Sequence, residues 1–273
     1  MAILVGAGSF FAGLLGSLTG LGGGAIIVPL LTLGFHVDLR YAIGASLVAV
    51  IATSSGAAAA YVREGYTNVR VGILLETGTT IGALMGAALS GAIPTAALAI
   101  LFGLVLLFAA YQSVRPHVDH VLAERPDKWA QRLRLDSTYP TEHGLQRYSV
   151  QGVPTGLGLM FGAGVLSALL GIGSGTIKVL AMDNAMKLPF KVSTTTSNFM
   201  IGVTAAASAG VYLHKGYVQP AIAFPVMLGV LAGALLGARL LTGLRTALLR
   251  RLFAILITAV ALEMLYKGFT GTI

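Results

Sequence analysis

Long apolar runs recur along this chain between short polar loops, and they constrain its fold more than any other feature. Runs of roughly 18 or more residues can cross the hydrocarbon core of a bilayer as helices. Hydrophobic residues make up 56% of the 273-residue chain and charged residues only 10%, whereas soluble domains average about 25% charged residues. The first run has no charge before it and no cleavage site after it, so we interpret it as a retained segment. The sequence therefore predicts an all-α integral membrane protein that is embedded in the lipid bilayer.

Charge and residue usage exclude several classes of protein. The formal net charge is +8, which basic residues in cytoplasmic loops beside anionic lipid explain without a nucleic-acid partner. The chain has no cysteine, which rules out disulfides, thiolate metal sites and cysteine nucleophiles. No Walker-type loop occurs, and the histidines lack paired metal-ligand spacing inside a span. We therefore expect no enzyme, no catalytic residue, no metal site and no cofactor.

The chain is an internal duplication with a period of 151 residues. That shift aligns residues 11–91 with residues 162–242 without a gap. The matches include glycines and tyrosines, which a shared apolar bias does not produce: Gly22 and Gly173, Gly24 and Gly175, Ser46 and Ser197, Tyr61 and Tyr212, Tyr66 and Tyr217. We therefore divide the chain into a transmembrane repeat 1–114, a polar connector 115–149 and a second transmembrane repeat 150–273.

Each repeat is expected to begin with a glycine-broken apolar segment and to continue with three apolar spans. The broken segments cover about residues 2–36 and 150–186. The spans are expected at about 41–62, 70–91 and 94–114, and at about 190–213, 219–240 and 245–267. We interpret the connector as a cytosolic linker that contains an amphipathic helix around Trp129.

Glycines recur at every fourth position in one span of each repeat. The two sets are equivalent under the 151-residue shift: Gly78, Gly82 and Gly86, then Gly229, Gly233 and Gly237. Small residues at this spacing let two helices approach closely in a membrane. We therefore expect these glycines to serve helix packing.

The distribution of basic residues indicates whether each broken segment crosses the membrane or turns back within it. If each segment crosses the membrane fully, lysines and arginines divide 10 to 7 between the two faces, leaving out Lys178 inside the membrane. If each break is instead the tip of a re-entrant hairpin, one face carries three and the other fourteen. Positive residues favour the cytoplasmic side, so the hairpin is preferred. It predicts both termini outside, the connector inside, and a second repeat inverted relative to the first.

The two glycine breaks predict a substrate site. Backbone that leaves a helix at membrane depth is tolerated only inside protein or beside a water-filled cavity, and breaks in inverted repeats are expected to meet near the midplane. The helices that begin after the breaks would direct free N–H groups into the site, which suits a small anion. The candidate binding residues are the break residues and nearby polar groups: Gly22, Gly23, Gly24, Ser46, Gly173, Ser174, Gly175, Lys178, Ser197 and Asn198. Their hydroxyls have an ordinary alternative use in hydrogen bonding between helices.

Two charged residues inside the predicted spans each have two interpretations. Lys178 replaces Ile27 of the first repeat, and it either faces an anion or has a structural use, by snorkelling or by pairing with Glu76 or Asp183. Glu76, whose counterpart is Met227, either carries a coupling proton or balances a basic neighbour. Freed carbonyls at the breaks make Na⁺ an equally good coupling ion.

The two break motifs resemble those of the TauE/SafE sulfite exporter family of membrane permeases. They read "GLGGGAIIVPLL" at 20–31 and "GIGSGTIKVL" at 171–180, and each lies about 20 residues before a span that carries a serine. The second copy has Leu180 where the first has Pro29, so only the first matches the fuller pattern. The breaks are typical of a secondary transporter, and the resemblance implies that its substrates are sulfur-containing anions, such as sulfite or sulfoacetate, carried across a bacterial inner membrane. The termini, expected outside, would then be periplasmic. An anion channel, or a permease for another small organic anion, is the alternative.

Overall fold

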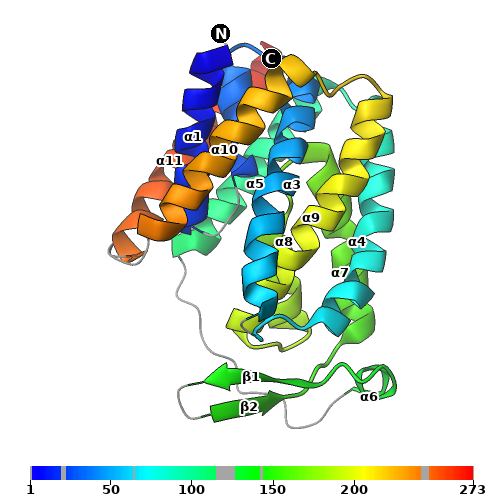
Figure 1. Ribbon diagram of the computed structural model, residues 1–273. Helices are drawn as coiled ribbons and strands as arrows, with labels where there is room; N and C mark the ends of the chain where they lie inside the picture. Colours follow the sequence, from blue (N-terminus) through cyan, green and yellow to red (C-terminus); the bar gives the residue numbers. More distant parts are fainter. Residues whose placement is uncertain are drawn as a thin grey trace.

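A bundle of helices forms most of the molecule, and a small hairpin lies across one end of it (Figure 1). The computed structural model describes residues 2–19, 23–63, 65–114, 127–141, 144–240 and 246–272. Both chain termini lie at the end of the bundle opposite the hairpin (Figure 1). The predicted helical class is confirmed for the bundle.

The order of helices in the first half recurs in the second. The first half contains α1 (Ala2–Thr19), α2 (Gly24–Pro29), the π-helical turn η1 (Leu30–Gly34), α3 (Leu39–Arg63), α4 (Val69–Leu89) and α5 (Thr95–Val114). The second contains α7 (Val153–Leu170), α8 (Gly175–Leu180), the π-helical turn η2 (Ala181–Ala185), α9 (Phe190–His214), α10 (Pro220–Leu240) and α11 (Thr246–Thr270). Every element of the first half begins 151 residues before its counterpart, which is the register of the sequence repeat.

The second broken segment turns back on itself. The backbone N–H of Gln151, just before α7, donates to the carbonyl of Met186, just after η2, over 3.1 Å. The chain through α7, α8 and η2 therefore returns to the end where it began. In the first half, Gly8 of α1 lies beside the side chains of Leu30 and Phe35, which follow α2. The second half thus opens with a helical hairpin whose tip is its glycine break, and in the first half α1 packs against the segment that follows α2.

Positive backbone φ angles explain why the second break is rich in glycine. Gly171 and Gly173 have φ angles of +67° and +72°, a left-handed conformation that glycine adopts without steric penalty. Ser174 follows with a φ of +48°. Three left-handed residues so close together end α7 and reverse the chain before α8 begins.

The two halves are interleaved. Helix α1 packs along α10 and α4 along α7, while α3 packs with α9 and α5 with α11. The predicted glycine sets lie in the first two interfaces. A Cβ on Gly86 would stand 2.5 Å from the carbonyl oxygen of Val165, and one on Gly233 would collide with that of Phe10. Close packing through glycine is therefore confirmed, although Gly237 lies outside the residues whose packing is described.

Helix length and surface composition suit a bilayer. Within the described residues, α4 (Val69–Leu89), α5 (Thr95–Val114) and α7 (Val153–Leu170) are long and apolar enough to cross a membrane, and four shorter apolar helical stretches accompany them. Large apolar side chains also cover the outside of the bundle, among them Phe11, Ile81, Phe224, Leu228 and Ile255. An outward-facing apolar surface of this extent is expected where the surrounding solvent is lipid.

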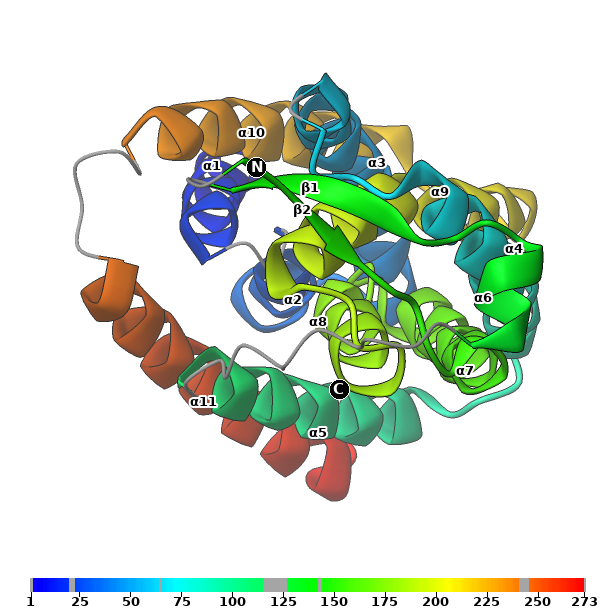
Figure 2. The ribbon, with the colours of Figure 1, turned by 90° about the horizontal axis from the view of Figure 1, so that it is seen from below.

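The described part of the connector is folded and packed against the bundle. It comprises α6 (Lys128–Arg132), β1 (Ser137–Thr141) and β2 (Gly144–Tyr148), and the hairpin crosses the helix ends (Figure 2). The helix expected around Trp129 is present as α6. The two strands of the hairpin were not predicted, and this part of the connector is tied to α4.

Asn68, the N-cap residue of α4, makes this attachment. Its side-chain nitrogen donates to the carbonyl of Leu135 over 2.9 Å and to the hydroxyl of Tyr148 over 2.8 Å. Its side-chain oxygen accepts from the N–H of Val71 and so caps the helix. Tyr148 is only 4% exposed, so the connector shares a buried core with α4.

Candidate functional site

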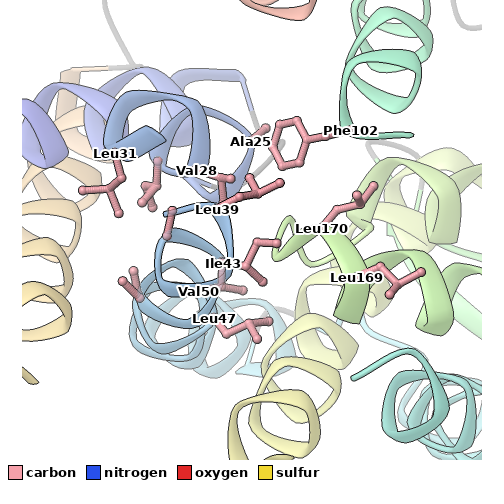
Figure 3. Close-up of a cluster of buried hydrophobic side chains, with 14 of the residues drawn as sticks. Ala25, Val28, Leu31, Leu39, Ile43, Leu47, Val50, Phe102, Leu169 and Leu170 are labelled. Atoms are coloured by element: carbon pink, nitrogen blue, oxygen red, sulfur yellow. The ribbon is translucent and has the colours of Figure 1, made fainter. Parts of the chain in front are cut away.

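The start of α2 meets the second glycine break inside the bundle. A Cβ placed on Gly24, the first residue of α2, would lie 2.8 Å from the carbonyl oxygen of Gly171 and 3.1 Å from the Cα of Ile172. The start of α2 therefore touches the break that precedes α8, as the repeat predicts. Apolar side chains from both halves pack around this junction (Figure 3), including Ala25, Val28, Ile43, Leu47, Phe102 and Leu170.

Two equivalent serines hold the backbone of the second break. The hydroxyl of Ser46, on α3, donates to the carbonyl of Gly171 over 2.7 Å. The hydroxyl of Ser197, on α9, donates to the carbonyl of Gly175 over 3.2 Å. Both serines are buried, so they supply donors to carbonyls that water does not reach. Of the two uses left open by the sequence, the structure shows hydrogen bonding to backbone.

A buried ionic cluster lies beside the break and consists of Glu76, Lys178 and Thr204. Lys178 Nζ, from α8, lies 3.8 Å from Glu76 Oε2, from α4. Lys178 Nζ also donates to the hydroxyl of Thr204, on α9, and that hydroxyl donates to Glu76 Oε1 over 2.6 Å. Lys178 and Thr204 are fully buried and Glu76 is 7% exposed. The hydroxyls of Thr79 and Thr80 each lie 3.2 Å from an oxygen of Glu76.

In this structure Lys178 has Glu76 as its ion-pair partner. Its ammonium group pairs with Glu76, and both charges lie at positions where the other repeat has apolar residues. A single buried charge without its partner would be strongly unfavourable, by about 3–5 kcal/mol. Lys178 and Glu76 stand where the other repeat has Ile27 and Met227. Each of these two charges therefore depends on the presence of the other. Thr204, the third member, was not among the predicted site residues, although its identity with Thr53 under the 151-residue shift was visible.

Other candidate residues line a small cavity that we call the break pocket. Its lining comes from the second break and from α2, α8, α5 and α11, among them Ala25, Val105, Ala109, Ser174, Ile177 and Ile257. Gly175 also contributes to this lining. Helix α8 thus contributes residues both to the break pocket and to the ionic cluster.

The remaining candidates are scattered around these two features. Gly173 packs against the side chain of Ile201, and Gly23 against that of Val230. Asn198 is half-buried on α9. Gly22 lies outside the described residues.

The fold and the site together define a multi-pass helical membrane protein with a buried charge pair beside two backbone breaks. The sulfite exporter TauE/SafE family matches residues 5–264. The chain belongs to this family and is a membrane transporter. The family indicated by the two break motifs is therefore confirmed.

Curated relatives from bacteria and an archaeon are similar over most of their length. The probable membrane transporter protein YunE of Bacillus subtilis (strain 168) is 26% identical over 264 residues, which cover 94% of each chain. YdhB of the same organism is 28% identical over 84% of this chain and 86% of its own. The probable membrane transporter protein MJ0441 of Methanocaldococcus jannaschii is 29% identical over 80% of this chain and 74% of its own. No solved structure matches the chain significantly.

Proposed function

We propose that this chain is an ion-coupled secondary transporter that carries small sulfur-containing anions, either sulfite or organosulfonates, by alternating access. The observation that carries the proposal is the buried pairing of Lys178 with Glu76, close to the contact between α2 and the second break. A buried ammonium group can bind an anion, and a buried carboxyl group can carry a proton. The family name supports the choice of sulfur anions.

Anion binding is coupled to proton binding because the anion replaces Glu76 as the partner of Lys178. An anion that binds the Lys178 ammonium displaces Glu76, whose carboxylate would then be buried without a counter-charge. Protonation of Glu76 removes that charge, so anion and proton occupy the cluster together. The hydroxyl of Thr204, which contacts both side chains, transmits the change between α8 and α4.

The positions of the chain ends support inverted repeats with re-entrant breaks. Helix α1 starts at the end of the bundle that carries both termini, and α7 starts at the end that carries the hairpin (Figure 1). Basic side chains of the connector favour a cytoplasmic position for the hairpin, namely Lys128, Arg132, Arg134 and Arg147. We infer a bacterial inner membrane with the termini in the periplasm.

Counterflow into proteoliposomes tests this function. Labelled sulfite is offered outside vesicles loaded with unlabelled sulfite, with sulfoacetate, thiosulfate, sulfate and acetate as competitors. The wild type and Lys267→Ala, which removes a half-buried lysine of α11 that pairs with Glu263, are expected to show saturable exchange that Lys178→Ala lacks. Uptake that does not saturate and shows no counterflow would identify an anion channel instead.

A paired variant separates loss of function from loss of folding. Glu76→Met with Lys178→Ile installs the side-chain types that Met227 and Ile27 provide at the equivalent place in the other repeat. We expect this variant to fold and to be inactive. Exchange that persists in the folded double variant would contradict the proposal.

A further inference from the structure

The break pocket has a position and a lining that the ionic cluster does not explain. It lies between the second break and the helices α5 and α11. Most of its lining is apolar, with Val105 and Ala109 from α5, Ile257 from α11 and Ile177 from α8. Such a lining gains free energy from contact with hydrocarbon and little from contact with a bare oxyanion.

Besides the half-buried Thr176, the polar residue in this lining is Ser174. It is 3% exposed, and its hydroxyl has no hydrogen-bond partner among the described residues. An unpaired buried hydroxyl is unfavourable, and so is the positive φ of Ser174, a conformation that suits glycine better. The equivalent residue of the first repeat is Gly23. A serine held in two unfavourable conditions within a cavity indicates that a ligand atom completes its hydrogen bonding.

We propose that the break pocket is a specificity pocket, in which Ser174 donates to the charged head of an organic anion and the apolar walls contain its short hydrocarbon substituent. The inference rests on the proposed anion transport and narrows its substrate class. An inorganic oxyanion such as sulfite would satisfy Ser174 and leave the apolar walls without contacts. Ala109 limits the length of the substituent, since a larger side chain there would fill the pocket.

A homologous series of alkanesulfonates tests the pocket. Methane-, ethane-, propane- and butanesulfonate are compared by thermal stabilisation of the purified protein, and as competitors in the counterflow of labelled sulfite. Each methylene that enters an apolar pocket is expected to strengthen binding about fourfold. The wild type and the control Ala97→Leu, an equal enlargement on the exposed face of α5, should both show this increase until the pocket is full.

Three variants sharpen the test. In Ala109→Leu, the gain with chain length should disappear while methanesulfonate binding changes less than about twofold. Ser174→Gly should weaken every homologue by about tenfold and keep the dependence on chain length. If Ala109→Leu does not fold, Ile257→Ala enlarges the pocket instead and should move the optimum to a longer homologue.

The outcomes separate this inference from the transport function. Equal dependence on chain length in the wild type and Ala109→Leu, or none in the wild type, would overturn the pocket. Sulfite counterflow without chain-length dependence would leave transport standing and refute the pocket. Chain-length-dependent stabilisation without counterflow of any anion would support the pocket and refute transport.

Discussion

Glu76 and Lys178 belong to different halves of a duplicated chain, and their side chains meet in the buried core with Nζ and Oε2 3.8 Å apart. The same place in the pseudo-equivalent arrangement is occupied by Met227 and Ile27, which carry no charge. Among the described residues, the ionic cluster therefore occurs at one of two equivalent places in the repeat.

Removal of one charge from this pair should destabilise the protein more than removal of both. Lys178→Ile alone leaves Glu76 buried without a counter-charge, with an expected loss of about 3–5 kcal/mol. Glu76→Met with Lys178→Ile should recover most of that loss. Denaturant unfolding in detergent of the wild type, both single variants and the double variant measures the coupling. Strictly additive losses would contradict the pairing.

Thr204→Val tests the hydroxyl that joins the two charges. Valine keeps the shape of threonine but removes both hydrogen bonds of the ionic cluster, each worth about 1.5–3 kcal/mol when a charged group is involved. We expect the exchange rate to fall by about tenfold or more. Thr53→Val, the same change at the equivalent position of α3, should leave the rate near that of the wild type. Equal rates for the two variants would show that Thr204 has no part in transport.

Glycine-to-alanine substitutions should have opposite signs in two helices that pack together. A Cβ on Gly82 in α4 would collide with the carbonyl of Phe161, whereas a Cβ on Gly158 in α7 meets nothing within 4 Å. Gly82→Ala should therefore destabilise by about 1–3 kcal/mol through overpacking. Gly158→Ala should stabilise by up to about 1 kcal/mol through helix propensity. Thermal unfolding midpoints of the two variants measure both effects, and a lower midpoint for Gly158→Ala would refute the second.

The connector carries its own optical reporter. Trp129 is the only tryptophan of the chain and lies on α6, half exposed beside the core that Tyr148 shares with α4. Asn68→Ala removes the donors to Leu135 and Tyr148, and it should release the connector at a lower denaturant concentration than the wild type requires. Tryptophan fluorescence during denaturant titration follows the release. A fluorescence transition unchanged by Asn68→Ala would show that this attachment is unimportant.

The same attachment should depend on pH in a defined range. Burial raises the pKa of Tyr148 to about 12, from an unfolded value near 10. The packed state thus retains the hydroxyl proton more strongly, so its contribution is complete below pH 10 and is lost as the pH rises toward 12. A shift of about two units corresponds to about 3 kcal/mol. The fluorescence transition should weaken across this range in the wild type and not in Tyr148→Phe; parallel curves would refute the assignment.

Elements that depend on local patterns were predictable from the sequence, and contacts between distant elements were not. Apolar runs and the repeat placed the long helices within a few residues, and the breaks were expected to meet, as Gly24 and Gly171 do. The pairing of Lys178 with Glu76 depends on how α8, α4 and α9 pack. The sequence does not show this packing, so it left several possible partners for Lys178. The strands ending at Tyr148 were missed because a contact with Asn68, far away in the sequence, stabilises them. The use of Ser46 and Ser197 as donors to break carbonyls also depended on three-dimensional position.

The bond from Ser46 to Gly171 crosses between the halves, as do the interfaces of α1 with α10 and of α4 with α7. Neither half is therefore self-sufficient: the hairpin of one is completed by helices of the other. A single half, made alone, would present open glycine-lined grooves that only another copy of the same kind could fill. Because the two copies are joined in one chain, each can differ from the other, as Glu76 differs from Met227 and Lys178 from Ile27.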